Sequence, residues 1–198
     1  MNWIAATLVV AGYLLGSVSF ALWLVRWRTG TDIRASGSGN AGATNVLRAH
    51  GKGLAIVVAL LDVAKGTAAV LLVRLVTADP WYAAAAGFAA ILGHVFPLYS
   101  GFRGGKGVAT AVGAFLALAP LAMAVCLAVF VAVVAATRFV SLGSVVAIVL
   151  LPPAAGLLSH SPRPIVVAAA ATAVLVVVKH LENLKRIARG EERRLGRR

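Results

Sequence analysis

The chain has 198 residues, of which 61% are hydrophobic and only 13% are charged, and its mean hydropathy is +0.93. Soluble domains contain about half apolar and about a quarter charged residues, so this composition excludes an ordinary soluble protein and predicts an integral membrane protein. The formal net charge of +13 fits the basic bias of cytoplasmic loops and anionic lipid better than it fits nucleic acid. The single cysteine, Cys126, lies in an apolar run, which excludes an internal disulfide.

Six apolar runs predict one bundle of membrane-spanning helices. They cover residues 4–25, 54–77, 81–99, 108–136, 140–159 and 165–178. A spanning helix needs about 20 residues to cross a core of about 30 Å, whereas the fourth run would extend over about 43 Å at 1.5 Å per residue. Pro120 lies near the middle of that run, and it predicts two short or tilted helices that meet there.

The basic residues distinguish six crossings from seven. With the fourth run split, 16 of the 19 lysines and arginines fall on one face: five between positions 26 and 52, two at 103 and 106, one at 138 and eight after position 178. With six crossings the last eight would move to the opposite face. The positive-inside rule therefore favours seven. We predict an all-α integral membrane protein with seven transmembrane helices, its N-terminus outside and its C-terminus cytoplasmic. We expect one domain over residues 1–198, with cytoplasmic loops at about 26–53, 100–107 and 179–198.

The first predicted loop carries the densest polar cluster, GSGNAGATNVLR, over residues 37–48. Its three glycines allow sharp turns and a close approach to a ligand. Its uncharged hydrogen-bonding side chains are those of Ser38, Asn40, Thr44 and Asn45. The forked charge of Arg48 suits a phosphate or carboxylate, and successive backbone N–H groups beside it would form an anion cradle. An ordinary Gly/Ser/Asn-rich connection is the alternative, but the density of donors favours a binding site.

A second cluster, GHVFPLYSGFRGGKG over residues 93–107, resembles a phosphate-binding loop, because Gly104 and Gly105 immediately precede Lys106. The next predicted helix would add its N-terminal dipole. The spacing is not that of a Walker A loop, since three residues rather than four separate Gly101 from Gly105 and a glycine follows the lysine. We therefore do not expect ATP hydrolysis. The alternative role for Arg103 and Lys106 is to anchor the helices at the membrane interface.

A third cluster, KHLENLKRIARGEE over residues 179–192, follows the last apolar run. His180 and Asn183 share a face if the last helix continues, and the histidine could serve as an acid, a base or a donor to an anion; an incidental interface residue is the alternative. Ser141, at the start of the sixth predicted helix, could donate to a ligand or cap that helix. From their predicted sidedness we expect these clusters to converge on one site at the membrane surface. Glu191, Glu192 and the tail arginines are expected to form a solvated, lipid-facing surface.

Asp62 and Lys65 are charges three residues apart in the second predicted helix. Intramembrane charges are costly, so we expect the two to face the interior and brace it as a pair; a proton relay is the alternative. His94, near a helix end, is expected to cap or brace the second loop. The six acidic residues show no metal-ligand spacing, and we expect neither a metal ion nor a cofactor.

Three motifs, GSGNAGATNVLR, GHVFPLYSGFRGGKGVAT and HLENLKRIARGEE, together resemble those of the bacterial acyl-phosphate:glycerol-3-phosphate acyltransferases, the PlsY family. The resemblance covers nearly the whole chain and extends to length, hydropathy and motif order. It implies a seven-helix inner-membrane enzyme whose site faces the cytoplasm. Such an enzyme transfers a fatty acyl group from acyl phosphate to the sn-1 hydroxyl of glycerol 3-phosphate, giving lysophosphatidate and phosphate in the first acylation of phospholipid synthesis. A separate enzyme would supply the acyl phosphate.

The resemblance also implies the site residues. The first motif contributes Ser38, Asn40, Thr44, Asn45 and Arg48; the second contributes Gly104, Gly105 and Lys106; later positions are Ser141, His180 and Asn183. Arg103 replaces an expected lysine, and Leu181 stands where an arginine is common.

We predict catalytic roles for Lys106, His180, Arg48 and Ser38, and substrate binding by the remaining residues of that set. On this hypothesis, Lys106 and the Gly104–Gly105 amides hold the acyl-phosphate group. Arg48, Ser38, His180 and Asn183 would orient glycerol 3-phosphate, and a substrate phosphate or His180 would accept the hydroxyl proton. The H-x-x-x-x-D motif of other glycerophosphate acyltransferases is absent, since none of the four histidines has an aspartate five residues later.

A transporter for an organic anion such as glycerol phosphate is the alternative function. Transporters often contain inverted repeats with broken helices at matching positions. No such repeat is visible here, and the polar clusters gather on one predicted side, which favours an enzyme. We expect its partners to be acyl phosphate, glycerol 3-phosphate and membrane lipids, with a functional link to an acyl-phosphate-producing enzyme and no nucleic acid.

Overall fold

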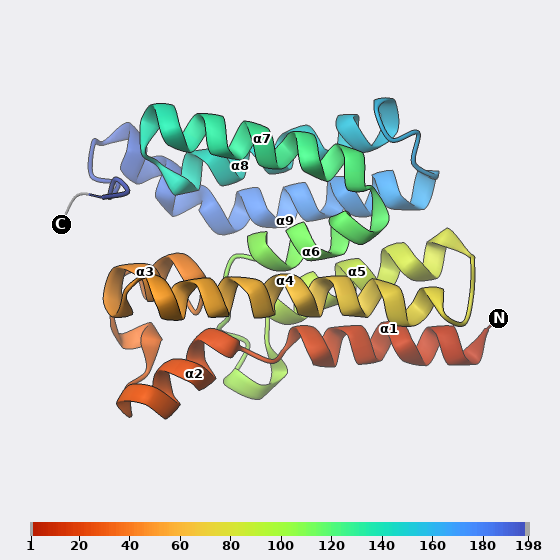
Figure 1. Cartoon of the computed structure of the whole chain (residues 1–198), viewed down its shortest axis with the longest axis horizontal. Coiled ribbons are helices and arrows are strands. Elements are labelled where there is room, and N and C mark those ends of the chain that lie inside the picture. The colour runs from red at the N-terminus through yellow and green to blue at the C-terminus, as the bar shows by residue number, and fades with distance from the viewer. Residues whose placement is uncertain (1, 197–198) are drawn as a thin grey trace. The chain divides into compact units, whose positions relative to one another are not determined.

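The computed structural model describes residues 2–196, and every regular element in that range is helical. The chain divides into two compact units, Met1–Leu118 and Ala119–Arg198, whose elements are labelled in Figure 1. The first unit contains α1 (Trp3–Gly16), α2 (Phe20–Thr29), the 3₁₀ turn η1 (Ile33–Ala35), α3 (Ala43–His50), α4 (Lys52–Arg74), α5 (Pro80–Val95), the 3₁₀ turn η2 (Leu98–Ser100) and α6 (Val108–Leu118). The second contains α7 (Pro120–Thr137), α8 (Val140–Leu157) and α9 (Arg163–Ala188).

Six helical segments of the described chain are long and apolar enough to cross a membrane: Trp3–Thr29, Lys52–Arg74, Pro80–Ser100, Pro120–Thr137, Val140–Leu157 and Arg163–Ala188. The prediction of an all-helical, multi-pass membrane protein is therefore confirmed. The shorter helix α6 has 11 residues, which makes it about 16 Å long, roughly half of a 30 Å hydrocarbon core.

The predicted break at Pro120 is confirmed. Helix α6 ends at Leu118, and Pro120 is the first residue of α7. A proline is tolerated at that position because the first N–H of a helix has no partner within it, whereas the same ring would disrupt a continuing α6.

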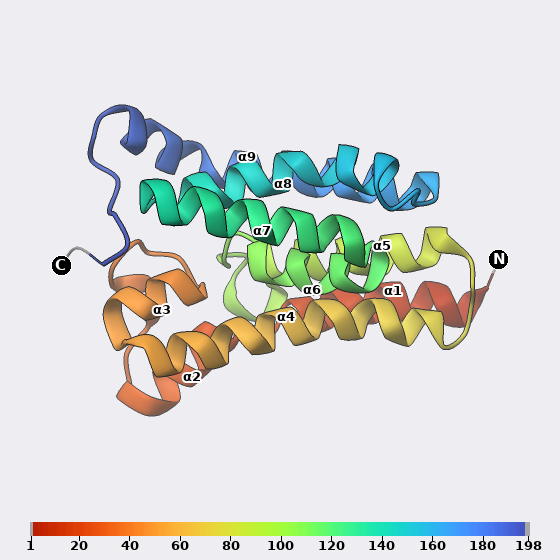
Figure 2. The same cartoon turned by 45° about the horizontal axis from the view of Figure 1, so that its top comes forward.

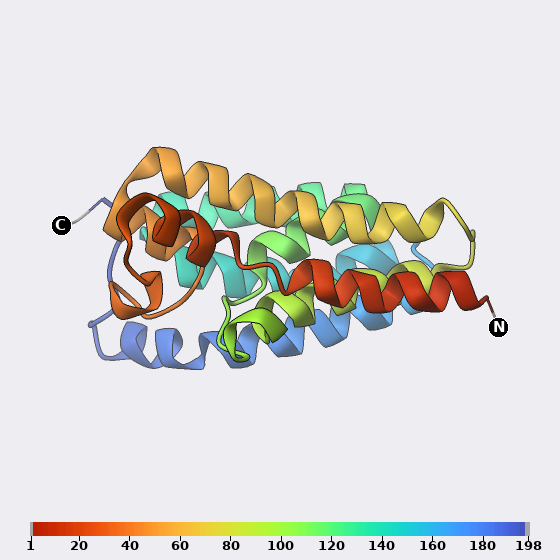
Figure 3. The ribbon, with the colours of Figure 1, turned by 90° about the horizontal axis from the view of Figure 1, so that it is seen from below.

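The first apolar run differs from the prediction, because it is divided into α1 and α2 where one helix was expected. The chain bends over the intervening residues 17–19, as Figures 1 and 3 show. The bend leaves the carbonyl of Val18 outside the helical hydrogen bonds, and the ammonium of Lys65 donates to it at 2.8 Å. The Lys65 side chain, 47 positions further along the chain, thus supplies the hydrogen bond that the Val18 carbonyl lacks within the helices.

Helix α4 is the centre of the first unit and packs against α1, α3, α5 and α6. Glycines allow the closest approach: a Cβ at Gly66 of α4 would overlap the backbone of Thr110 in α6, and one at Gly113 of α6 would overlap that of Val63 in α4. Small residues commonly permit such contacts between membrane helices. This packing fixes the connection between α5 and α6, which carries the second glycine-rich cluster.

In the second unit, α8 packs against both α7 and α9 (Figure 2). The turn between α7 and α8 passes through Arg138, whose φ is +65°. The carbonyl of Arg138 accepts a 2.7 Å hydrogen bond from the backbone N–H of Leu195. The segment that follows α9 therefore returns to the start of α8, where Ser141 lies.

Candidate active site

The first polar loop folds around the side chain of Asn45, which is only 2% exposed. The Asn45 Oδ1 atom accepts a 2.8 Å hydrogen bond from the backbone N–H of Ser38. On the other side, Asn45 Nδ2 donates to three backbone carbonyls at 2.9–3.0 Å, those of Ile33, Ser36 and Asn40. The hydrogen bonds of one amide side chain thus hold together a loop that has little regular secondary structure.

Gly37 makes that arrangement possible. Its φ is +61°, a left-handed conformation that residues with a Cβ rarely adopt, and a Cβ there would overlap Asn45 Oδ1. The loop glycines were expected to let a ligand approach the backbone closely. At Gly37, the group that approaches closely is the Asn45 side chain. The structure gives Asn45 a supporting task inside the loop, and its predicted substrate contact stays a prediction.

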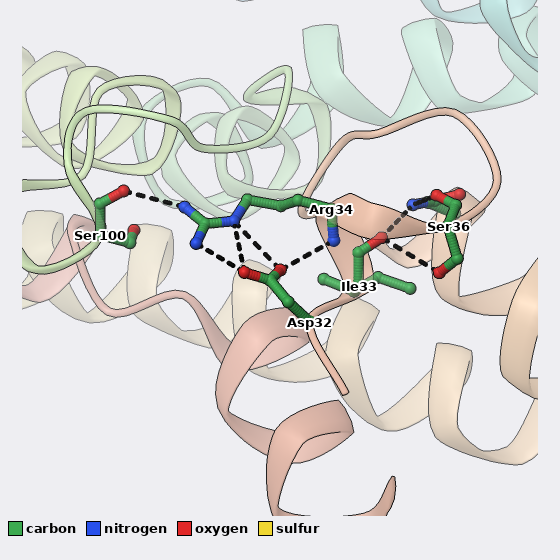
Figure 4. Close-up of polar contacts among 6 residues, drawn as sticks. Asp32, Ile33, Arg34, Ser36 and Ser100 are labelled. Carbon is green, nitrogen blue, oxygen red and sulfur yellow. Dashed lines mark hydrogen bonds and ion pairs between the residues drawn. The ribbon is translucent and has the colours of Figure 1, made fainter. Parts of the chain in front are cut away.

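Arg34 joins the first loop to the second, as Figure 4 shows. Its guanidinium donates to both oxygens of Asp32 at 2.6–3.1 Å and to the carbonyl of Ser100 at 3.0 Å. The hydrogen bonds from Arg34 lower the pKa of Asp32 below its usual value, and those same bonds raise the pKa of Arg34. Sequence reasoning counted Arg34 only as a basic residue, because nothing local indicates a partner 66 positions away.

The remaining predicted residues of the first loop lie closer to the surface. Ser38 and Asn40 are half-buried, and Asn40 Nδ2 donates to the Ser38 carbonyl at 3.1 Å. Thr44, in the first turn of α3, is half-buried, and Arg48 of the same helix is exposed. Ser38, Thr44 and Arg48 therefore lie within one short segment, in which Asn45 holds the backbone of Ser38.

The second loop rests on His94, at the last turn of α5. The backbone N–H of Gly105 donates to the His94 carbonyl at 3.1 Å. Cβ atoms at Gly104 and Gly105 would overlap the carbonyl and the imidazole of His94 respectively. The predicted bracing role of His94 is thus confirmed. The Gly105 amide, predicted to hold a phosphate, is directed to His94 instead, while Lys106 is half-buried immediately beyond it.

Asp62 and Lys65 pair within the first unit, as predicted, with Lys65 Nζ 2.8 Å from Asp62 Oδ1. Their side chains are 2% and 1% exposed. His94 Nδ1 lies 3.4 Å from the same Asp62 oxygen, a contact that spacing along the sequence did not indicate.

In the second unit, three side chains donate to the carboxylate of Glu192, which is 7% exposed. Ser141 Oγ and Asn183 Nδ2 reach Oε1 at 3.0 and 2.7 Å, and Arg186 Nε reaches Oε2 at 2.8 Å. The prediction that Glu192 is solvated is therefore wrong, because these donors stabilise a buried charge; Glu191 is exposed, as expected. Burial by itself raises the pKa of Glu192, but the hydrogen bonds from Asn183, Arg186 and Ser141 outweigh it and lower that pKa.

His180 is buried on α9, one turn before Asn183. Its Nδ1 lies 2.8 Å from the carbonyl of Val176. Because a carbonyl can only accept, Nδ1 carries the proton, and in the neutral ring the lone pair is on Nε2. The contact with the backbone thus fixes the orientation of the ring.

The structure therefore gathers the predicted residues into local clusters. In the first unit, Arg34 links the loop of Ser38, Asn40 and Asn45 to the loop of Gly104, Gly105 and Lys106. In the second unit, Glu192 links Ser141 to Asn183. Convergence of all the clusters on one site stays a prediction.

Comparison with known proteins gives a consistent result. Residues 6–190 match the family model described as glycerol-3-phosphate acyltransferase. Proteins of that name from Geobacter sulfurreducens and Halorhodospira halophila are 47% and 49% identical to this chain, covering 94% and 96% of it and 95% of each relative. A crystal structure of PlsY, an integral membrane glycerol 3-phosphate acyltransferase in its glycerol 3-phosphate form, matches with a TM-score of 0.92 at 37% identity and covers 97% of this chain and 96% of that one. The lysophosphatidic acid form gives a TM-score of 0.89 at 35% identity, covering 97% and 95%.

Replacement of the buried Glu192 tests its supporting role. We expect Glu192→Ala to lower the melting temperature in detergent, because buried donors left without an acceptor cost about 1–3 kcal/mol. The charge contribution also depends on pH. A carboxylate whose folded pKa is lowered stabilises the fold above its unfolded pKa of about 4.3, and this contribution is lost as the pH falls through the folded value.

The melting temperatures of the wild type and Glu192→Gln are therefore expected to differ at pH 7 and to approach each other below about pH 4. Glu191→Gln, at the exposed neighbour, is the matched control and should melt like the wild type at both pH values. A pH-independent difference for Glu192→Gln would show that the charge of Glu192 contributes nothing to stability.

Proposed function

Because this chain belongs to the glycerol-3-phosphate acyltransferase family, we propose that it transfers a fatty acyl group from acyl phosphate to the sn-1 hydroxyl of glycerol 3-phosphate. The products are lysophosphatidate and inorganic phosphate. The observation that carries this proposal is the pair of polar loops in the first unit, joined by Arg34 and bearing Arg48 and Lys106. Both proposed substrates carry phosphate, which such cations and loop amides suit.

The reaction needs positioning more than a covalent intermediate. The glycerol hydroxyl oxygen attacks the acyl carbonyl carbon, the bond from that carbon to the phosphate oxygen breaks, and phosphate leaves with the bonding electron pair. The hydroxyl proton passes to a substrate phosphate or to His180 Nε2. Because the leaving group is already a stable anion, the protein has to orient the two substrates and stabilise the charge that develops on the carbonyl oxygen.

The contacts within the loops refine the predicted roles. We assign Lys106 and the Gly104 amide to the acyl-phosphate group, with Gly105 as their support on His94. Arg48 and the Ser38 hydroxyl are assigned to glycerol 3-phosphate, with Asn45 as the support of Ser38. Ser141 and Asn183 are assigned supporting roles through Glu192, which accepts from both.

The proposed topology has seven crossings in the bacterial inner membrane, an external N-terminus and a site facing the cytoplasm. The one-sided distribution of basic residues supports it. The short α6 would complete its crossing with the glycine-rich segment before it, where Gly105 and Gly107 are buried. Irregular backbone is tolerated at membrane depth only where the protein supplies its hydrogen bonds or it lines a cavity, and His94 supplies one.

The purified protein in detergent, given palmitoyl phosphate and glycerol 3-phosphate, is expected to release inorganic phosphate only when both substrates are present and to form lysophosphatidate. Palmitoyl-CoA as a parallel donor should support little turnover. Lys106→Ala should lower kcat/KM by about 100-fold, the usual scale for loss of one charge-stabilising group.

His180→Ala separates the two proton acceptors in the same assay. Full turnover would exclude His180 as the acceptor and leave a substrate phosphate, whereas a loss of kcat would show that turnover needs His180. No turnover from folded wild-type protein, together with uptake of labelled glycerol 3-phosphate into liposomes, would replace the acyltransferase with a transporter.

Cysteine labelling tests the topology. In a Cys126→Ala background, a single cysteine introduced between residues 191 and 196 should react with a membrane-impermeant reagent only after the cells are opened. A cysteine at Arg163 is the opposed control and should react in intact cells. Labelling of the tail position from outside would overturn the seven-crossing arrangement.

A further inference from the structure

A buried charge cluster lies directly behind the second loop. Asp62 and Lys65, on consecutive turns of α4, and His94, on α5, are 1%, 3% and 6% exposed. One oxygen of Asp62 is 2.8 Å from Lys65 Nζ and 3.4 Å from His94 Nδ1. Lys65 is further held by the Val18 carbonyl at 2.8 Å and lies 5.5 Å from the centroid of the Phe20 ring.

Such a cluster is costly for a helix bundle that needs only to be stable. Charges inside membrane segments are expensive and commonly functional. Even in soluble proteins, replacing a buried ion pair with well-packed apolar residues is often neutral or stabilising. The position of His94 suggests what the cluster provides here.

The two ring nitrogens of His94 face different parts of the protein. Nδ1 is beside Asp62, whereas Nε2 is the atom that a Cβ at Gly105 would overlap. The carbonyl of the same residue accepts the Gly105 N–H at 3.1 Å, and a Cβ at Gly104 would overlap that carbonyl. The imidazole therefore lies between the buried carboxylate and Gly105, where it leaves no space for a side chain.

We propose that His94 is a positioning residue for Lys106, with its ring orientation fixed by Asp62 and the Asp62 carboxylate held in turn by Lys65. Lys106 follows Gly105 directly, so the position of Gly105 sets that of the lysine backbone. This inference rests on the proposed function, in which Lys106 binds a substrate phosphate. Displacement of a substrate-positioning group by about 1 Å can cost about 100-fold in rate, which gives the cluster a function beyond stability.

The test removes the charges together, because single variants leave an unpaired buried charge and fold poorly. Asp62→Leu/Lys65→Met replaces the pair with apolar side chains of similar volume. We expect this variant to fold, but to melt below the wild type because the Val18 carbonyl loses its donor. It should raise, by about tenfold or more, the KM of the same substrate whose KM is raised by Lys106→Ala. Hydrogen exchange of the amides in residues 101–107 should also accelerate, a readout that does not depend on turnover.

A second test variant and a matched control complete the experiment. His94→Asn keeps an amide nitrogen near the position of Nδ1 but leaves space beside Gly105, and should show the same rise in KM. Thr67→Val is the matched control: Thr67 lies on α4 and donates to the Gly113 carbonyl at 2.9 Å, away from the loop, and should leave both KM values and the loop exchange unchanged.

The possible outcomes separate the inference from the function on which it rests. If Lys106→Ala impairs turnover while the folded double variant keeps wild-type KM values and slow loop exchange, the cluster is only structural and the inference is overturned. If Lys106→Ala itself has no effect on either substrate, the proposed role of Lys106 is wrong, and the inference fails with it.

Discussion

Where a polar loop is buried against an apolar helix bundle, its backbone groups must find partners inside the protein, because burial excludes water and lipid offers no partners. In each loop of the first unit, one residue supplies such partners: Asn45 through its side chain in the first loop, and His94 through its carbonyl in the second. Asn45 makes hydrogen bonds to four backbone groups of the first loop. The His94 carbonyl accepts from Gly105 of the second. Internal contacts therefore hold both loops, and such pre-organisation is what charge stabilisation in catalysis requires.

Several of the basic residues pair with carboxylates in the described part of the chain. Lys65, Arg34 and Arg186 are engaged with Asp62, Asp32 and Glu192 respectively, so their charges hold the protein together. Carboxylates in a chain of net charge +13 thus act as fixed partners for the cations and amides around them. Among the cations of the predicted motifs, Arg48 and Lys106 lie on the loops themselves and are the ones assigned to substrate phosphates.

Hydropathy and motif content were enough to predict the membrane class, the family and most helices. Pro120 marked the break between α6 and α7 because its effect is local. The bend between α1 and α2 could not be foreseen, since its stabilisation comes from Lys65 through a contact distant in sequence. The hydrogen bonds of Asn45 and Gly105 to neighbouring backbone were not predicted, because their partners are set by how the loops fold. Glu192 was misjudged because a carboxylate in a basic tail is normally solvated, and only the return of the chain to the start of α8 buries it.

The most direct test of the pre-formed first loop is the activity of Asn45→Ala. Four hydrogen bonds worth about 1 kcal/mol each are lost, so the loop should become mobile while the helices remain. We predict a fall in kcat/KM of tenfold or more, with little change in helical content by circular dichroism. Ser36→Ala, which removes a single 3.3 Å hydrogen bond to Ile33, is the matched control and should stay near wild-type activity. Wild-type kinetics for a folded Asn45→Ala protein would contradict the view that internal contacts hold the first loop ready for its substrate.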